Sequence, residues 1–198
     1  MAKSTEESDE DVKSRYEYRV WGEHRKARKK LAGLASEVTK QDYEDCYLIG
    51  DDPDWNAKIR DDELKVKQLV GEKKGFEQWT SAWHETSESA PKPFDDLFNE
   101  LRLDRPQRGK SFNLLKAVAK LDPDTGVSAV FVTKHRRRYK IGTIKAEVTD
   151  VEIHGSKEVM RTLSIEGNDL DELVALRKEL GLRDEPNLPM HVAIDAGF

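Results

Sequence analysis

The sequence predicts an α+β domain built on an antiparallel sheet that is strongly curved or closed. Short segments typical of strands dominate the chain, and segments with helical spacing lie at their connections. Several strands carry Lys or Arg at alternate positions, which places both cations on one face because side chains alternate along a strand. Such a face is hard to bury in a core. Inside a wide barrel it stays hydrated while the outer face packs against helices.

Composition limits the class of protein. The 198 residues, of which 36% are hydrophobic, suffice for a core without disulfides, and we expect a single domain over 14–198. The single cysteine, Cys46, cannot form an intramolecular bridge; with no signal-type or membrane-spanning apolar run, the sequence favours the cytoplasm and no membrane. The formal net charge of −5 means that clustered cations do not reflect general basicity, so nucleic acid is the less favoured partner.

The N-terminal half is expected to be a tail followed by strands and one helix. Residues 1–13 are acidic and serine-rich with almost no apolar content, which predicts a disordered tail. Alternation, helical spacing and turn signals predict a strand at 15–21, a helix at 23–36, and a meander of strands at 45–49, 55–60 and 63–70. The stretch 71–109 mixes tryptophans with prolines and is assigned only as a helical or loop insertion, with helical periodicity at 94–103.

The C-terminal half is expected to contain two helices and three long strands. Residues 111–121 have amphipathic helical spacing and end at an Asp-Pro pair, which stops a helix. The next three segments, 127–139, 141–153 and 159–166, are rich in residues that favour strands. A final helix is predicted at 168–180, with Gly181 as its C-cap.

The alternating cations predict a concentrated site for a polyanion. Arg15 and Arg19 flank Glu17 on the opening strand, and three further pairs follow along the chain. These pairs are Lys58 and Arg60, Lys65 and Lys67, and Lys134 and Arg136. Any single pair could equally be an ordinary solvated sheet face, and the run 135–138 could be a patch for nucleic acid or a partner outside the barrel.

The strand at 141–153 has two possible orientations. If Ile144, Ala146 and Val148 face outward onto helices, Lys145 and Glu147 point inward. The opposite parity would turn Asp150 and Glu152 inward instead.

An ordered series of motifs over 15–182 resembles the CYTH, or triphosphate tunnel metalloenzyme, family. After the charged opening strand and its helix come, in order, the D-x-Y of Asp45 to Tyr47, the pair Lys58 and Arg60, the L-x-V-K of Leu64 to Lys67, the K-x-R of Lys134 to Arg136, and the closing Ser164-Ile165-Glu166-Gly167. The resemblance implies an eight-stranded antiparallel β tunnel with helices packed outside. Members bind triphosphate in the tunnel and hydrolyse or cyclise triphosphate compounds.

The resemblance also implies roles for individual residues. It assigns phosphate oxygens to Arg19, Lys58, Arg60, Lys65, Lys67, Lys134 and Arg136. It assigns Mg²⁺ or Mn²⁺ to Glu17, Glu147 and Glu166. The chain departs from the family where Arg15 and Ser164 stand at positions expected to hold carboxylates, and each lost carboxylate removes an oxygen ligand and compensating charge.

Two functions are therefore consistent with the sequence. The first is a metal-dependent triphosphatase that hydrolyses a phosphoanhydride bond, with no dedicated catalytic base visible. The alternative is a catalytically degenerate tunnel that binds a polyphosphate or a nucleotide without metal. Either function implies a ligand that is a small molecule containing triphosphate or polyphosphate.

Overall fold

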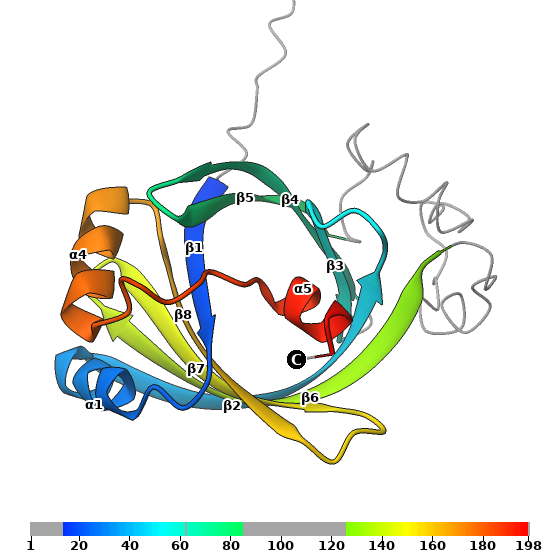
Figure 1. The fold of residues 1–198 in the computed structure, drawn as a ribbon, viewed down its shortest axis with the longest axis horizontal. Helices are drawn as coiled ribbons and strands as arrows, with labels where there is room; N and C mark the ends of the chain where they lie inside the picture. The colour runs from blue at the N-terminus through cyan, green and yellow to red at the C-terminus, as the bar shows by residue number, and fades with distance from the viewer. Residues whose placement is uncertain (1–13, 62, 85–125, 198) are drawn as a thin grey trace, which may run out of the picture.

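The eight strands form one closed antiparallel barrel, which Figure 1 shows nearly end on. The structure is a computed structural model that describes residues 14–61, 63–84 and 126–197. Around the barrel the strands follow the order β1-β5-β4-β3-β2-β6-β7-β8, so β1 closes the ring between β5 and β8. The predicted α+β tunnel fold is confirmed.

The strands are long, and three helices accompany them in the described part of the chain. The strands are β1 Ser14–Trp21, β2 Glu37–Ile49, β3 Trp55–Arg60, β4 Glu63–Lys73, β5 Phe76–His84, β6 Ser128–Ile141, β7 Ile144–Ile153 and β8 Val159–Gly167. The helices are α1 Arg25–Leu34, α4 Leu170–Leu180 and α5 Met190–Asp195. No described helix has the length and apolar character needed to cross a membrane.

The structure makes one predicted strand much longer and adds two elements that the sequence reading missed. β2 begins at Glu37 rather than at residue 45. Its first half is polar and lacks the apolar alternation that marks a strand in a sequence, yet it pairs with β6 from Glu37 onward. β5 lies within the stretch assigned only as an insertion. A tight turn at Lys74 and Gly75, both with positive φ, folds it back onto β4. The short helix α5 was not predicted either.

Some predicted elements lie outside the described residues. These are the N-terminal tail at 1–13, the helices predicted at 94–103 and 111–121, and the rest of the insertion beyond residue 84. The predicted final helix is present as α4. The Asp169 side chain caps it by accepting from the backbone N–H groups of Asp171 and Glu172, and Gly181 ends it in the left-handed conformation.

The main core lies on the outside of the barrel, where α1 and α4 cover one side (Figure 1). Leu31 of α1 and Leu173 of α4 are fully buried there. The outward side chains of β7 predicted from strand parity, Ile144, Ala146 and Val148, belong to the same cluster. Because the helices bury the outer face of these strands, the inner face is left for polar groups.

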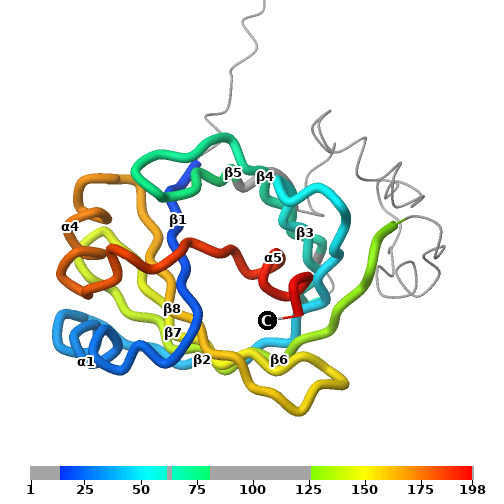
Figure 2. Tube along the Cα trace, in the orientation of Figure 1, coloured from blue at the N-terminus to red at the C-terminus, as the bar shows by residue number. Residues whose placement is uncertain are grey.

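The C-terminal segment closes one end of the barrel. Figure 2 shows it crossing β1 and ending with α5 inside the barrel outline. The crossing is fixed where Leu188 N–H donates to the Arg19 carbonyl at 2.9 Å and the Trp21 indole donates to the Leu188 carbonyl at 2.9 Å. Met190 and Ile194 of α5 then pack in a second apolar cluster with side chains from the barrel interior. The buried strand residues of this cluster are Tyr47, Ile49, Val132 and Val151.

The outer core predicts a contrast between two leucines of the same helix. Leu31 is fully buried, whereas Leu34 is 40% exposed. We expect Leu31→Ala to lower the free energy of unfolding by about 2–5 kcal/mol because it leaves a cavity, and Leu34→Ala to change it by about 0.5 kcal/mol or less. Urea denaturation of both variants measures this. Equal losses would contradict the placement of α1 on the barrel.

Candidate functional site

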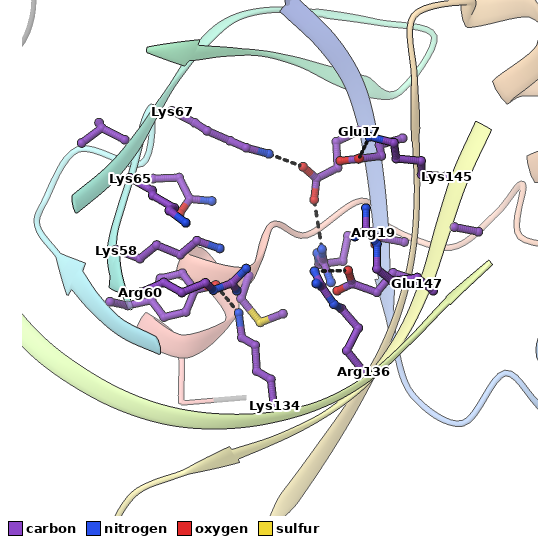
Figure 3. Close-up of a pocket in the computed structure, with 18 residues that line it drawn as sticks. Glu17, Arg19, Lys58, Arg60, Lys65, Lys67, Lys134, Arg136, Lys145 and Glu147 are labelled. Carbon is purple, nitrogen blue, oxygen red and sulfur yellow. Dashed lines mark hydrogen bonds and ion pairs between the residues drawn. The ribbon is translucent and has the colours of Figure 1, made fainter. Parts of the chain in front are cut away.

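The barrel encloses a cavity of about 250 Å³ with a large excess of positive charge. Nine lysines and arginines line it, against three glutamates. The cations are Arg19, Lys58, Arg60, Lys65, Lys67, Lys134, Arg136, Arg138 and Lys145, and the carboxylates are Glu17, Glu147 and Glu166. Figure 3 labels all of these except Arg138 and Glu166, and shows the labelled side chains converging from opposite walls of the barrel.

All ten residues that the sequence reading assigned to phosphate or metal line this cavity. The structure thus brings them together, while their roles stay predictions. The alternative inward carboxylates are not among the lining residues, because Asp150 pairs with Arg161 and Glu152 lies on the outer side near His135. In the 135–138 run, His135 and Arg137 are exposed, and Arg136 and Arg138 line the cavity.

A buried carboxylate beneath the cavity holds three of these cations. Asp45 accepts two hydrogen bonds from Arg60, at 2.5 and 2.6 Å, and one from the Lys134 ammonium at 2.9 Å. The Lys58 ammonium lies 3.7 Å from the same carboxylate. Burial alone would raise the pKa of Asp45, but these cations outweigh it and hold the pKa well below its usual range. Asp45 therefore stays ionised and keeps the three cations close together.

Two tyrosines on the same face of β2 support four of the cations. The Tyr43 ring lies between two guanidinium groups, 4.0 Å from Arg60 and 4.4 Å from Arg136. The Tyr47 ring faces the ammonium groups of Lys134 at 4.5 Å and Lys58 at 5.6 Å. A cation over an aromatic face is attracted by the ring quadrupole, so the tyrosines offset part of the repulsion between like charges.

Two of the clustered lysines carry a marked shift of their pKa. Burial, which disfavours the charged form, lowers the pKa of Lys58 to about 8, and the neighbouring Lys134 and Arg60 cations add to this effect. Burial likewise lowers the pKa of Lys134 to about 8 although Asp45 partly compensates. Both lysines would hold their protons more strongly if an anion entered the cavity.

Each carboxylate that lines the cavity is already paired with cations. Glu17 accepts from Arg19 at 3.0 Å and from Lys67 at 3.2 Å. Burial alone would raise the pKa of Glu17, but these two cations outweigh it and hold the pKa well below the usual range.

The other two carboxylates lie on β7 and β8. Glu147 accepts from Arg136 at 2.9 Å and from the Thr149 hydroxyl at 2.8 Å. Burial would raise the pKa of Glu147, yet the arginines beside it lower the pKa overall. Glu166 lies 3.5 Å from the Arg15 guanidinium and 3.9 Å from the Lys145 ammonium.

The donor set does not fit a resident divalent metal ion. Mg²⁺ and Mn²⁺ need several oxygen ligands around one point. Across 14–61, 63–84 and 126–197, no three or more His, Cys, Asp or Glu side chains form a group that could hold a metal. The charges of the three glutamates are instead directed at arginine and lysine groups.

Several buried polar atoms at the cavity wall lack a hydrogen-bond partner within the described residues. They include the Nε–H groups of Arg19 and Arg136 and the side-chain oxygen of Asn56. A buried donor without an acceptor is costly. Each of these two guanidinium groups can therefore donate one further hydrogen bond to an acceptor oxygen of a ligand.

The sequence reading missed several residues that shape the site. Tyr43 and Asp45 hold the cations, Arg138 enlarges the charged lining, and Met190 of α5 contributes an apolar patch. Lys145, which strand parity turned inward, also lines the cavity. Period two on β2 could have revealed the first two, because Tyr43, Asp45 and Tyr47 share one face. Arg138 also follows Arg136 at the same period. The position of Met190 depends on tertiary packing and has no local signal.

Solved structures share the fold. No family model matches the sequence, and no curated protein matches it. The PH1012 protein of Pyrococcus horikoshii OT3 matches with a TM-score of 0.54 at 16% identity, covering 90% of this chain and 97% of that one. A conserved hypothetical protein of Pyrococcus furiosus matches with a TM-score of 0.50 at 17% identity, covering 89% and 96%. At these identities the likeness establishes a shared fold, the closed barrel that the CYTH resemblance predicts, and nothing about chemistry.

The buried position of Asp45 predicts a large loss of stability on its neutralisation. Asp45→Asn leaves three buried cations without their shared anion, so we expect the free energy of unfolding to fall by about 3–5 kcal/mol in urea denaturation. The control is Asp54→Asn, the same substitution at an exposed position, which should change the free energy of unfolding by about 0.5 kcal/mol or less. Wild-type stability in Asp45→Asn would show that this carboxylate does not hold the cluster together.

Proposed function

We propose that the cavity binds the triphosphate or polyphosphate group of a small anionic molecule. The observation that carries this proposal is the convergence of nine cations and three carboxylates on one enclosed space. A cavity with such an excess of one charge, bounded by low-dielectric walls, concentrates its field on a ligand of the opposite charge.

The side chains suit phosphate oxygens in two complementary ways. Arginine presents a planar fork that can contact two oxygens at once, and lysine acts as a compact point charge. The unsatisfied Nε–H groups of Arg19 and Arg136 are donors that a phosphate oxygen would complete. The pKa of Lys58, lowered by burial, would rise again beside a polyanion, so binding and protonation support each other.

The size of the cavity favours a compact group. Pockets for drug-sized molecules span about 300–1,000 Å³, whereas this cavity measures about 250 Å³. A short chain of phosphates fits such a volume better than an entire nucleotide. Any organic portion of the ligand would then lie toward the exposed side, near Arg15 and Lys145, whose side chains are 44% and 46% exposed, and a cytoplasmic phosphate compound is the expected partner.

Hydrolysis of a phosphoanhydride bond is the second candidate. The observation that favours it is that Glu17 and Glu166 are directly paired on β1 and β8 and both line the cavity, where the family resemblance expects ligands of Mg²⁺ or Mn²⁺. Since their charges are engaged by cations, we derive no catalytic step through a metal. Release of phosphate in the binding experiment distinguishes an enzyme from a binding module.

Titration calorimetry with inorganic triphosphate tests the proposed ligand class. Arg136 lines the cavity and its neighbour Arg137 is exposed. Loss of charged hydrogen bonds in Arg136→Met should weaken binding about 10- to 100-fold, and Arg137→Met should change it about twofold or less. Wild-type affinity should fall as salt rises. Absence of binding at low salt would rule out the proposal, and phosphate measured in the same samples reports turnover.

The pH dependence of binding provides a separate test. Below pH 8 both Lys58 and Lys134 are charged in the empty cavity, and binding needs no proton uptake. Above pH 8 each must regain a proton, so affinity should fall by up to about tenfold per pH unit for each lysine. Calorimetry in buffers of different ionisation enthalpy counts the protons taken up. Lys58→Met should remove part of this uptake, and uptake identical to wild type would contradict the assignment.

A further inference from the structure

We infer that Glu17, Glu147 and Glu166 are internal counter-ions of the anion site, and that the phosphate ligand displaces them from their cation partners without any need for a divalent metal. This inference rests on the proposed function. Beyond that function, it explains how the empty site is stabilised and which side chains the ligand displaces. It also predicts which variants bind the ligand more tightly.

Glu17 shows the counter-ion arrangement most clearly. Its two oxygens accept from cations on different strands, Arg19 of β1 at 3.0 Å and Lys67 of β4 at 3.2 Å. Figure 3 shows the Lys67 side chain extended across the cavity toward Glu17. A carboxylate that spans two walls in this way keeps both cations near the position that a phosphate would occupy.

Glu147 holds a third cation by a similar contact. The Arg136 guanidinium donates to one oxygen at 2.9 Å, and the Thr149 hydroxyl donates to the other at 2.8 Å. The Arg136 side chain is only 12% exposed, and its Nε–H has no acceptor within the described residues. The glutamate thus satisfies one edge of the guanidinium and leaves a donor for a ligand oxygen.

Glu166 is the most accessible of the three. Its partners are Arg15 at 3.5 Å and Lys145 at 3.9 Å, and the Arg15 and Glu166 side chains are 44% and 29% exposed. The long distances and the exposure make this the weakest pairing in the cavity. A phosphate that enters from this exposed side would therefore displace Glu166 first.

A divalent ion would meet an unfavourable field in this cavity. To gather the three carboxylates it would have to break their cation contacts and then lie among nine Lys and Arg groups. Like charges at short range repel strongly where the dielectric constant is low. A phosphate chain does the reverse, because it takes over the cations directly and releases the carboxylates to water or to neighbouring donors.

The counter-ion and metal-ligand roles predict opposite effects of neutralising a glutamate. If the glutamates compete with phosphate for the same cations, Glu→Gln frees a cation and strengthens binding. If they hold a metal that binds phosphate, Glu→Gln removes a ligand and weakens binding. The sign of the change therefore separates the two roles.

The test is calorimetric titration of wild type, Glu166→Gln and Glu147→Gln with inorganic triphosphate, in EDTA and in excess Mg²⁺. We expect binding in EDTA, with affinity raised about fivefold in Glu166→Gln and about tenfold in Glu147→Gln. The control is Glu179→Gln, an exposed α4 position outside the cavity lining with the same change of charge, and it should change affinity about 1.5-fold or less. Arg15→Gln should weaken binding about fivefold.

Two results would overturn the inference while leaving the proposed function intact. One is binding that disappears in EDTA, and the other is weaker binding in both glutamine variants. Because Glu166 is partly exposed, its neutralisation should leave the thermal transition within about 2 °C of wild type, which keeps the comparison interpretable. Failure of the wild type to bind triphosphate under any condition would instead reject the proposed function itself.

Discussion

The buried Asp45 carboxylate makes the rest of the site possible. Enclosing many like charges in a small cavity is opposed by their repulsion and by the cost of removing them from water. Asp45 offsets both effects for Arg60, Lys58 and Lys134, because one ion with no side-chain exposure contacts all three. It lies on β2, the strand that pairs with both β3 and β6, which carry these cations. The register of β2 against β3 and β6 is therefore stabilised by these ion pairs as well as by backbone hydrogen bonds.

The outer face of the barrel supplies most of the apolar core, and the inner face carries the charged cavity. This core lies between the outer face and the helices α1 and α4, where Tyr18, Ile165 and Leu173 are buried almost completely. The inner face therefore does not have to supply most of the hydrophobic stabilisation, and it can tolerate ions that would destabilise an ordinary core. Toward α5 the interior becomes apolar, and there Met190 forms part of the cavity wall.

Period-two alternation is a local signal, so it predicted the curved antiparallel sheet and the cation pairs on one strand face, and the family resemblance named the ten residues that the structure brings to the cavity. The sequence reading predicted β2 too short because residues 37–44 are polar on both faces, and it did not find β5 among the tryptophans and polar residues after Gly75. The contacts of Glu17 and Glu147 could not be predicted either. Which cation a carboxylate meets depends on barrel closure and strand tilt, and those are properties of the whole sheet. A motif can therefore identify the residues of a tunnel without identifying their partners.

The position of β1 in the barrel has a consequence for the order of folding. β1 lies between β5 and β8, so the first described strand completes its pairing only with the last one. Glu17 and Glu166 become neighbours across a very long loop, and α5 can close the end only after that. Pairings between distant residues form slowly. During synthesis the lysines and arginines of the early strands thus remain in water until β8 has left the ribosome, and the charged interior is enclosed only after that.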